Sequence, residues 1–394
     1  MQPTSAPVIL QILPSLVTGG VERGTVEITD AIARAGGTAL VASSGGPLVA
    51  EIERAGGRHI TLPLATKSPL GIWRNADRLT ALIQAERVGI VHARSRAPAW
   101  SGWLASRMTG AHFITTYHGT YSENLPFKRR YNAVMARGEI VIAASRFIAE
   151  TIQRQHGLPE ERIRVIPRGI DPAVFDPAAV APERTTKLAR DWGVPKEAPV
   201  LMLPGRLTAW KGQSVLIEAL PRLRHHTAHA VLVGSDQGRR RYTADLLALA
   251  KRLGVAERVH LAGNCADMPG ALMLADVVVH ASTQAEAFGR VVIEAQAMGR
   301  LVVAADLGGP VETVAHGVTG WRVLPGDAAA LAAAIDHALA LSPQERQATG
   351  ERARMAVLRG ATVQGMQQAT LDVYETVLRK DGLTFPARER SAEP

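Results

Sequence analysis

The sequence predicts an α/β protein of two domains, each built on a parallel β-sheet with helices on both faces. Short apolar runs typical of strands alternate with longer amphipathic segments along the chain, which is the pattern of such a sheet. At 394 residues, of which 46% are hydrophobic, the chain is ordinary globular material but longer than one hydrophobic core usually supports. A stretch rich in proline and charge, residues 167–199, separates two halves of similar pattern. We therefore place a domain boundary near residue 186.

Each half carries its own series of expected strands. In the first half they span residues 8–13, 38–43, 59–64, 90–93, 112–118 and 139–145. In the second half they span residues 200–203, 229–234, 259–262, 277–281 and 301–305. The pattern after residue 325 is helical, and a charged tail is expected to be disordered. The predicted parts are domains 1–186 and 187–360, a helical segment 361–380 and the tail 381–394.

The composition narrows the classes of partner. The chain carries 45 basic and 36 acidic residues, a formal charge of +9, which favours anionic small molecules or an anionic membrane surface. Aromatic residues make up 4% of the chain and do not alternate with basic residues, so nucleic acid is the partner least expected. No apolar run approaches the roughly 20 residues of a membrane-spanning helix.

Cysteine usage and the first residues favour the cytoplasm. The single cysteine, Cys265, excludes an internal disulfide framework and a cysteine-based zinc site, which agrees with a reducing compartment. Residues 1–7 lack the cationic start and the apolar stretch of a signal peptide. We therefore expect a cytoplasmic protein.

Loops that follow strands are the candidate sites, because open α/β sheets bind ligands beyond the carboxyl ends of their strands. The first such loop carries Gly19 and Gly20 ahead of a helix. Glycines let the backbone approach a ligand, and a helix N-terminus offers N–H groups to an anion. A tight strand-to-helix turn explains the two glycines equally well. They do not form the G-x-G-x-x-G fingerprint, so dinucleotide binding is not indicated.

Two further loops carry basic side chains. His118 and Gly119 follow a strand end, where a histidine can serve catalysis, although a lone histidine is more often structural. In the loop 204–212, Arg206 and Lys211 precede a helix that begins near Gly212. A guanidinium can grip two phosphate oxygens, an ammonium adds a point charge and the helix end adds its dipole, so this loop suits a diphosphate. A solvated basic loop is the alternative.

The fourth loop and the helix after it carry two carboxylates. Glu286 precedes the helix and Glu294 lies within it, so the two are not neighbours on one helical face. Carboxylates accept paired hydrogen bonds from vicinal diols, so one glutamate can hold a sugar and the other a ribose. The N–H groups of Phe288 and Gly289 would then lie near the diphosphate. The alternative is one surface glutamate and one on the helix face.

Together these loops resemble the retaining glycosyltransferases of family 4, including bacterial lipopolysaccharide and cell-envelope enzymes. The most specific match is the E-x7-E motif from Glu286 to Glu294, with Gly205-Arg206 and Lys211-Gly212 upstream of it. Further matches are Gly19-Gly20 with Glu22-Arg23, Tyr117-His118-Gly119, residues 166–171 and Gly308-Gly309-Pro310. The resemblance implies the GT-B fold, in which two Rossmann-like domains face a central cleft and a C-terminal helix returns to the N-terminal domain. Domain 1–186 would then be the acceptor side and domain 187–360 the donor side.

The resemblance also implies roles for single residues. Arg206 and Lys211 would bind the donor diphosphate, Glu294 the nucleotide ribose and Glu286 the hydroxyls of the donor sugar. His118 would lie by the donor sugar, and the Gly19-Gly20 backbone near the phosphates or the acceptor. The implied donor-binding residues are completed by Gly205, Phe288, Gly289 and Arg290.

The implied reaction transfers a sugar from a UDP- or GDP-linked donor to a glycan or lipid-linked acceptor with retention of configuration. The departing diphosphate itself helps to deprotonate the acceptor, so no nucleophilic carboxylate is required. Fixed cations stabilise the charge on the leaving oxygen. The strand-end loops hold no Asp-x-Asp pair, so we expect no metal and no cofactor besides the donor.

Some positions depart from the family pattern. His280-Ala281-Ser282 and Arg300-Leu301 stand where many relatives have a proline, and the loop 233–238 lacks the usual Gly-x-Gly. The last departure leaves recognition of the base open. The sequence also leaves open the sugar, the acceptor, the linkage and the oligomeric state.

Two basic segments suggest further partners. Residues 127–137 combine Lys128, Arg129, Arg130 and Arg137 with Phe127, Val134 and Met135, so they can lie against an anionic bilayer or form an ordinary surface helix. Arg94 and Arg96 follow a strand end on the acceptor side, where they can meet an anionic acceptor. The alternatives to a transferase are a sugar-nucleotide epimerase or hydrolase of the same fold, and a non-catalytic nucleotide-binding scaffold.

Overall fold

The computed structural model describes residues 6–17, 19–121 and 126–386, and the chain forms two compact units. Unit 1 comprises Met1–Arg168 and Val363–Pro394, and unit 2 comprises Gly169–Thr362. The units therefore part at Arg168, earlier than the boundary expected near residue 186. The residues after Arg168 are bound within unit 2: the backbone carbonyl of Phe175 accepts a hydrogen bond of 2.9 Å from Arg354, and Arg184 binds Asp267 at 2.9 Å.

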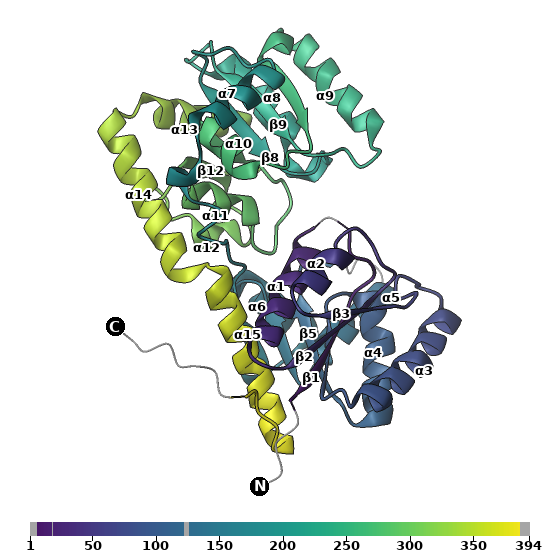
Figure 1. Cartoon of the computed structure of the whole chain (residues 1–394). Helices are drawn as coiled ribbons and strands as arrows, with labels where there is room; N and C mark the ends of the chain where they lie inside the picture. The colour runs from purple at the N-terminus through teal and green to yellow at the C-terminus, as the bar shows by residue number, and fades with distance from the viewer. Residues whose placement is uncertain (1–5, 18, 122–125, 387–394) are drawn as a thin grey trace. The chain divides into compact units, whose positions relative to one another are not determined.

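Unit 1 is built on a seven-stranded sheet in the order β3-β2-β1-β4-β5-β6-β7, with every neighbouring pair parallel (Figure 1). Its strands are β1 (Val8–Ile12), β2 (Thr38–Ser43), β3 (Arg58–Thr61), β4 (Ile90–Ala93), β5 (His112–Tyr117), β6 (Ile140–Ala143) and β7 (Ile163–Val165). The central strands are buried on both faces, and β4 is buried at every position.

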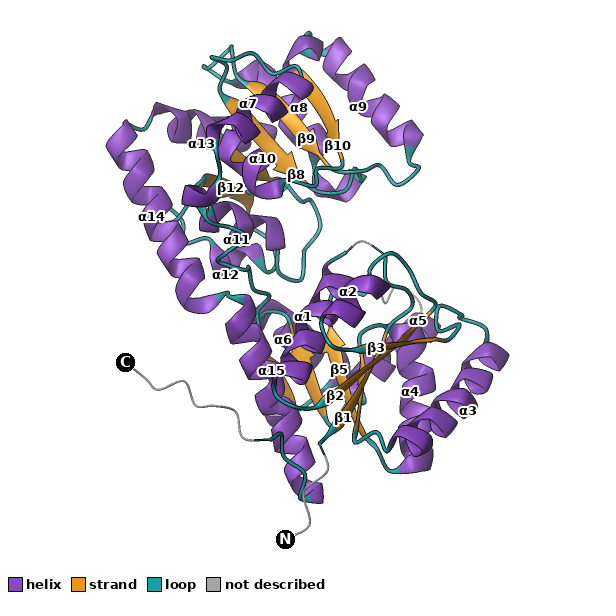
Figure 2. Cartoon of the chain, in the orientation of Figure 1, coloured by secondary structure: helices purple, strands orange, loops and turns teal. Residues whose placement is uncertain are grey.

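Helices cover both faces of this sheet. Figure 2 shows α3 and α4 on one face and α1 with α15 on the other. The helices of unit 1 are α1 (Gly20–Arg34), α2 (Val49–Arg54), α3 (Pro69–Glu86), α4 (Arg96–Thr109), α5 (Pro126–Asn132), α6 (Arg146–His156) and α15 (Val363–Leu378), with short 3-10 helices η1 (Ala133–Ala136), η2 (Glu160–Arg162) and η7 (Arg379–Asp381).

Unit 2 repeats the plan with six parallel strands in the order β10-β9-β8-β11-β12-β13. The strands are β8 (Val200–Pro204), β9 (His229–Val233), β10 (Val259–Gly263), β11 (Val277–His280), β12 (Leu301–Ala305) and β13 (Trp321–Val323). The helices are α7 (Pro182–Asp191), α8 (Gln213–Ala219), α9 (Arg240–Arg252), α10 (Met268–Leu274), α11 (Arg290–Ala297), α12 (Pro310–Thr313), α13 (Ala328–Ala340) and α14 (Pro343–Gly360), with 3-10 helices η3 (Pro177–Ala179), η4 (Ala209–Lys211), η5 (Leu220–Arg222) and η6 (Ala256–Arg258).

The C-terminal helix α15 completes the core of unit 1, as the resemblance implied. Tyr374 and Leu378 are fully buried in one hydrophobic cluster with Ile9 and Ile32. The hydroxyl of Tyr374 also hydrogen-bonds Nδ1 of His92 on β4 at 2.6 Å. Because the segment supplies apolar surface to the α1 face of the sheet, unit 1 is incomplete without it. Of the predicted tail, residues 387–394 lie outside the described residues.

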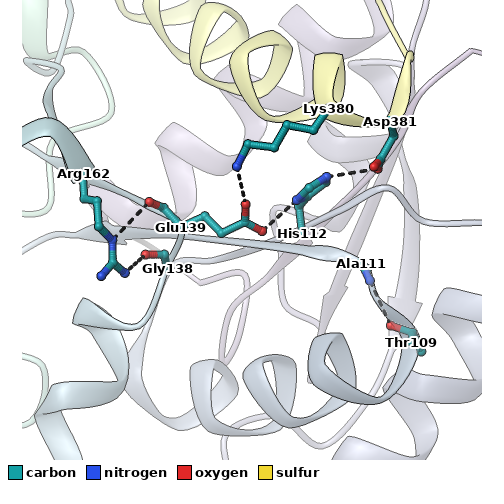
Figure 3. Close-up of polar contacts among 8 residues, drawn as sticks. All are labelled: Thr109, Ala111, His112, Gly138, Glu139, Arg162, Lys380 and Asp381. Atoms are coloured by element: carbon teal, nitrogen blue, oxygen red, sulfur yellow. Dashed lines mark hydrogen bonds and ion pairs between the residues drawn. The ribbon is translucent and has the colours of Figure 1, made fainter.

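A cluster of polar contacts joins η7, the short helix after α15, to the sheet (Figure 3). His112, at the start of β5, contacts Glu139 through Nδ1 at 2.7 Å and Asp381 through Nε2 at 3.0 Å. Lys380 Nζ contacts the second oxygen of Glu139 at 3.0 Å. Burial raises the pKa of Glu139, but the hydrogen bonds and charges of His112 and Lys380 lower this pKa by more than burial raises it. The pKa of Glu139 therefore lies below its ordinary value. Glu139 is therefore ionised near neutral pH.

Candidate functional site

The strand order of unit 2 reverses between β8 and β11, and this point carries most of the predicted site. Chain-consecutive strands run outward from β8 to β9 and β10 on one side, and from β11 to β12 and β13 on the other. In parallel sheets a crevice opens at the carboxyl ends of such a strand pair. The loop with Arg206 and Lys211 follows β8, and the loop with Glu286 follows β11.

Two glycines hold the neighbouring loops together. Gly212 has φ of +74°, and a Cβ atom there would overlap the carbonyl group of Ala281. Gly234 has φ of +150°, and a Cβ atom there would overlap the carbonyl group of Gly205. Only a residue without a side chain fits either place. The loops after β8, β9 and β11 therefore form one continuous backbone surface.

Glu286 lies at the centre of a buried polar cluster. One oxygen, Oε1, lies 2.6 Å from Lys211 Nζ and 2.7 Å from His280 Nε2, and it also accepts a hydrogen bond from Ser282. The side chains of Lys211 and Glu286 are 11% and 12% exposed. The backbone carbonyl of Glu286 accepts a hydrogen bond of 2.8 Å from Gly309. Both the side chain and the main chain of Glu286 are thus held in place by hydrogen bonds.

The cluster keeps Glu286 ionised. Burial raises its pKa, but the hydrogen bond and charge of His280 and the ammonium of Lys211 outweigh burial and hold this pKa well below the ordinary range. A buried carboxylate with one heavily bonded oxygen is a rigid acceptor for hydroxyl groups. His280 and Ser282 supply this rigidity. The sequence pattern did not predict their role, although His280-Ala281-Ser282 departs from the pattern of the family that the chain resembles.

Arg206 has different surroundings from Lys211. Its side chain is exposed, and the described part of the chain gives its guanidinium no hydrogen bond or ion pair. Its backbone carbonyl, by contrast, is held by Gln213 Nε2 at 2.9 Å. The loop is therefore fixed while all five guanidinium donors are available to a ligand.

The remaining donor-side residues surround the start of α11. Gly289 is the N-cap with φ of +80°, Phe288 before it is buried, and the amides of both precede the first turn. Within the helix, Glu294 Oε1 contacts Arg290 Nε at 3.0 Å. As predicted, Glu286 and Glu294 lie on different elements. The N-terminus of α11 lies between them in the sequence and points its N–H groups away from the helix.

A pocket that the sequence did not reveal extends along the ends of β8, β9 and β10. Its lining residues come from the loops after these strands, from β10 itself and from α9: Leu207, Gly234, Ser235, Asp236, Thr243, Leu261, Gly263 and Asn264. It includes part of the loop 233–238, whose departure from Gly-x-Gly left base recognition open. Because Leu207 and Gly234 belong both to this pocket and to the Arg206 loop surface, the two features are continuous.

Gly19, Gly20 and His118 belong to unit 1, so each is described there. Gly19 is the N-cap of α1, and its carbonyl accepts from Arg23 at 3.0 Å, as in an ordinary strand-to-helix turn. A Cβ on Gly20 would meet nothing within 4 Å. Thr18, which precedes them, lies outside the described residues. The two glycines are consistent with a tight strand-to-helix turn. The space next to the Gly20 backbone is unoccupied by other protein atoms.

His118 follows β5 and has one fixed proton. Nδ1 accepts a hydrogen bond from the guanidinium of Arg168, which leaves the proton of the neutral ring on Nε2. Burial, and then the charges of Arg168 and Arg94, lower the pKa of His118 well below its ordinary value. Nε2 is buried and has no hydrogen-bond partner among the described residues. The ring therefore presents a neutral N–H donor.

The basic segment 127–137 divides into α5 and η1. Phe127 is 65% exposed, and Lys128, Arg129 and Arg130 are exposed beside it. The expectation that Val134 and Met135 share this surface is wrong, because both are fully buried in η1. In the described residues no helix is long and apolar enough to cross a bilayer. Nor do these residues contain a cluster of three or more His, Cys, Asp or Glu side chains suited to a metal ion.

Comparisons with known proteins agree across both units. The family model for glycosyltransferase family 4 matches residues 18–174, and the model for glycosyl transferases group 1 matches residues 185–356. A crystal structure of a glycosyltransferase from Rickettsia africae is 37% identical, with a TM-score of 0.88 over 95% of this chain and 99% of that one.

Two further relatives carry more specific names. The structure of Anabaena Alr3699/HepE in complex with UDP-glucose is 28% identical, covers 94% of this chain and 99% of that one, and has a TM-score of 0.81. The D-inositol 3-phosphate glycosyltransferase of Xylanimonas cellulosilytica is 28% identical over 74% of this chain and 72% of its own length. The likeness therefore extends over both units rather than over one sheet alone.

Proposed function

This chain is a glycosyltransferase that belongs to family 4 and has the GT-B fold, and we propose that it transfers a sugar, with retention of configuration, from a nucleotide diphosphate to a glycan or lipid-linked acceptor of the cell envelope. The nucleotide sugar is proposed because the HepE structure is a complex with UDP-glucose. The observation that carries the proposal lies where the strand order of unit 2 reverses and a crevice is expected. The loop after β8 brings Arg206 and Lys211 to this point, and Lys211 contacts Glu286 of the loop after β11.

The crevice suits a diphosphate that leaves a sugar. Arg206 has its guanidinium free to grip two oxygens of the diphosphate, and Lys211 adds a charge already held in position by Glu286. Negative charge builds up on the leaving oxygen as the glycosidic bond breaks, and preorganised cations stabilise it without reorganising. We propose that this replaces a metal ion, so that the reaction needs no metal and no cofactor besides the donor.

The two carboxylates divide the donor between them. Glu286 would accept hydrogen bonds from the sugar hydroxyls through the oxygen that its cluster does not saturate, and Glu294 would bind the ribose. Phe288, Gly289 and Arg290 at the start of α11, with Gly205, would line the diphosphate between them. The pocket past Ser235 and Asp236 is the proposed place of the base.

His118 is proposed to donate its Nε2 proton to a hydroxyl of the donor sugar. Its neutral, fixed tautomer supports a hydrogen-bonding role rather than that of a general base, because Nδ1 is already occupied by Arg168. Gly19 and Gly20 would let backbone approach the phosphates or the acceptor.

We further propose that α5 brings the protein to the inner face of the cytoplasmic membrane. Phe127, exposed next to three cations, is the kind of surface that binds anionic lipid, worth about 1 kcal/mol per basic residue. A triple alanine variant of Lys128, Arg129 and Arg130 should lose binding to phosphatidylserine vesicles, measured by co-sedimentation. Absent or salt-insensitive binding by the parent would end this part of the proposal.

The use of an activated sugar is tested with a panel of UDP- and GDP-sugars and no acceptor. A transferase of this kind should hydrolyse its own donor slowly to free sugar and nucleoside diphosphate, with the anomeric configuration retained in the first product. Release of an epimerised sugar, or turnover of no activated sugar, would contradict the proposal. Release of an epimerised sugar would identify an epimerase. Absence of turnover by a protein that still binds the nucleotide sugar would identify a nucleotide-binding scaffold.

A further inference from the structure

Three donors converge on one oxygen of Glu286. Lys211 Nζ lies 2.6 Å from Oε1 and His280 Nε2 lies 2.7 Å from it. The Ser282 hydroxyl donates to the same oxygen. A carboxylate oxygen offers about two lone-pair directions, so it cannot bond three donors fully. The other oxygen, Oε2, has no partner among the described residues. One of the three donors on Oε1 is therefore in excess.

Lys211 is the donor that can leave. His280 ends β11 and Ser282 follows two residues later, and their side chains are 3% and 1% exposed. Lys211 reaches Glu286 from the loop after β8, with its ammonium 4.8 Å from the ring centre of Trp210. It donates to Glu286, and the described part of the chain gives its other two N–H groups no hydrogen bond. An ammonium on a flexible stem can turn to a new partner, whereas two buried side chains at a strand end stay in place.

Glu286 depends more on His280 than on Lys211 for its charge. Burial raises the pKa of Glu286, and the hydrogen bond and charge of His280 lower this pKa more than those of Lys211 do. Loss of one partner is costly to a buried charge that has no other donor. Because His280 and Ser282 remain, Glu286 stays compensated when Lys211 turns away.

The imidazole of His280 is directed at this carboxylate. Its Nε2 carries a proton, because a bare ring nitrogen would repel the carboxylate oxygen that lies 2.7 Å away. The same nitrogen lies 3.3 Å from Ser282 Oγ. Its Nδ1 is buried and has no hydrogen-bond partner among the described residues. The polar contacts of the ring therefore hold Glu286 and Ser282 together.

We propose that His280 is a positioning residue of the donor site: with Ser282 it holds Glu286 while the ammonium of Lys211 turns from Glu286 to the diphosphate. A diphosphate carries more negative charge than one carboxylate and offers several oxygens, so it competes for the ammonium. Glu286 then keeps its place, with Oε2 available to the sugar hydroxyls. The inference rests on the proposed function and gives a part in it to His280, which departs from the family pattern.

Glu286→Gln tests the exchange of partners. The full chain is titrated in a calorimeter with UDP and with GDP, neither of which carries a sugar for Glu286 to hold. If the diphosphate draws Lys211 away from a carboxylate, loss of that negative charge should tighten binding of the nucleotide by up to about tenfold. The gain should vanish when Glu286→Gln is added to Lys211→Ala. Unchanged or weaker binding by Glu286→Gln would overturn the exchange.

His280→Asn and His280→Gln test the positioning role. A glutamine amide can reach the place of Nε2 and donate to Glu286, whereas an asparagine amide is too short. His280→Asn should bind the nucleotide about tenfold more weakly, because Glu286 then retains Lys211, and His280→Gln should restore the affinity of the parent. Added to Glu286→Gln, His280→Asn should have no effect, which a general loss of packing would not reproduce.

The controls keep this test decisive. His226→Asn is the matched control, since His226 is exposed in unit 2. Glu286→Gln changes the shape of the side chain little, so it tests the exchange even where His280→Asn fails to fold. Parent affinity in a folded His280→Asn, or an effect of His280→Asn that persists without the carboxylate, would overturn the positioning role.

A carboxyl NMR titration separates failure of this inference from failure of the proposed function. It uses no nucleotide, and the Glu286 signal is assigned by its loss in Glu286→Gln. The pKa of Glu286 should rise more in His280→Asn than in Lys211→Ala, because His280 lowers it more. A larger rise in Lys211→Ala would overturn the role of His280. A parent that binds neither UDP nor GDP would instead contradict the proposed function, and the titration would still measure which side chain holds Glu286.

Discussion

Arg206 and Lys211 carry the same charge in one loop but have different surroundings. Lys211 is largely buried, with its side chain 11% exposed, and is paired with Glu286, whereas Arg206 is exposed and the described residues leave its guanidinium without a partner. Under the proposed function the pair therefore separates two contributions, because Lys211 also supports the fold whereas Arg206 would serve only the ligand. Residue positions alone did not predict this difference.

Alanine substitution should separate these contributions. Arg206→Ala should lower transfer by on the order of 10²- to 10³-fold and leave the melting temperature unchanged. Lys211→Ala should lower transfer similarly but also cost about 1–3 kcal/mol of stability, because Glu286 loses a buried partner. Steady-state kinetics and thermal unfolding measure both, with Arg222→Ala, exposed in η5, as the control. Near-normal turnover of either variant would refute its assignment.

The tautomer of His118 makes a second residue-level prediction. In the parent, His118 should stay neutral, with its proton on Nε2, well below pH 6.5. Arg168→Ala removes a nearby charge and the donor to Nδ1, so the pKa of His118 should rise and both tautomers should appear. Arg168→Lys keeps a cation and a donor and should restore the parent behaviour. An NMR titration of the ring decides, and an unchanged titration in Arg168→Ala would contradict the account.

Strands were predictable where their sequence is mostly apolar and buried. The ranges expected for residues 38–43, 90–93 and 301–305 coincide with β2, β4 and β12, and most other expected strands differ only at their ends. The sequence did not reveal β7 or β13, each a three-residue edge strand. An edge strand needs no continuous apolar run, because it is covered less completely. Only the sheet context identifies it.

The glycine contact between loops can be tested at the level of elements. Gly212→Ala would force a Cβ against the carbonyl of Ala281 at a positive φ, and should cost about 1–3 kcal/mol and much of the transfer activity. Gly254→Ala is the matched control, since Gly254 has φ of +69° but open space around it. The difference in melting temperature between the two variants measures the cost of the steric contact with Ala281, because both variants place an alanine at a positive φ. Equal stability losses would show that the contact is unimportant.

At the scale of the whole molecule, the C-terminal helix is what makes unit 1 discontinuous in sequence. The GT-B resemblance predicted its return, but local sequence could not show what it contacts, because Tyr374 and His92 are far apart in the chain. The donor-side loops were predicted from motifs, whereas the partners of Glu286 and the pairing of His118 with Arg168 depend on tertiary contacts. Motifs predict candidate ligand-binding residues more readily than the residues that position them.

The attachment of this helix should depend on pH. The pKa of Glu139 is lower in the folded chain than its ordinary value of about 4.3. Its contribution to stability is therefore present above that value and is lost as the pH falls through the folded-state pKa. Glu139→Gln should lower the melting temperature at pH 7, and this difference should shrink as the pH falls below the ordinary value. A difference that does not change with pH would contradict the role given to this carboxylate.

The central claim is that the crevice between β8 and β11 binds the diphosphate of a nucleotide sugar. Calorimetric titration of the full chain with UDP and GDP, for the parent, Arg206→Ala, Glu294→Gln and the control Arg222→Ala, tests it most directly. The account predicts that the parent and the control bind one of the two nucleotides, and that the two site variants bind it at least about tenfold more weakly. A parent that binds neither nucleotide, or site variants that bind as tightly as the parent, would contradict it.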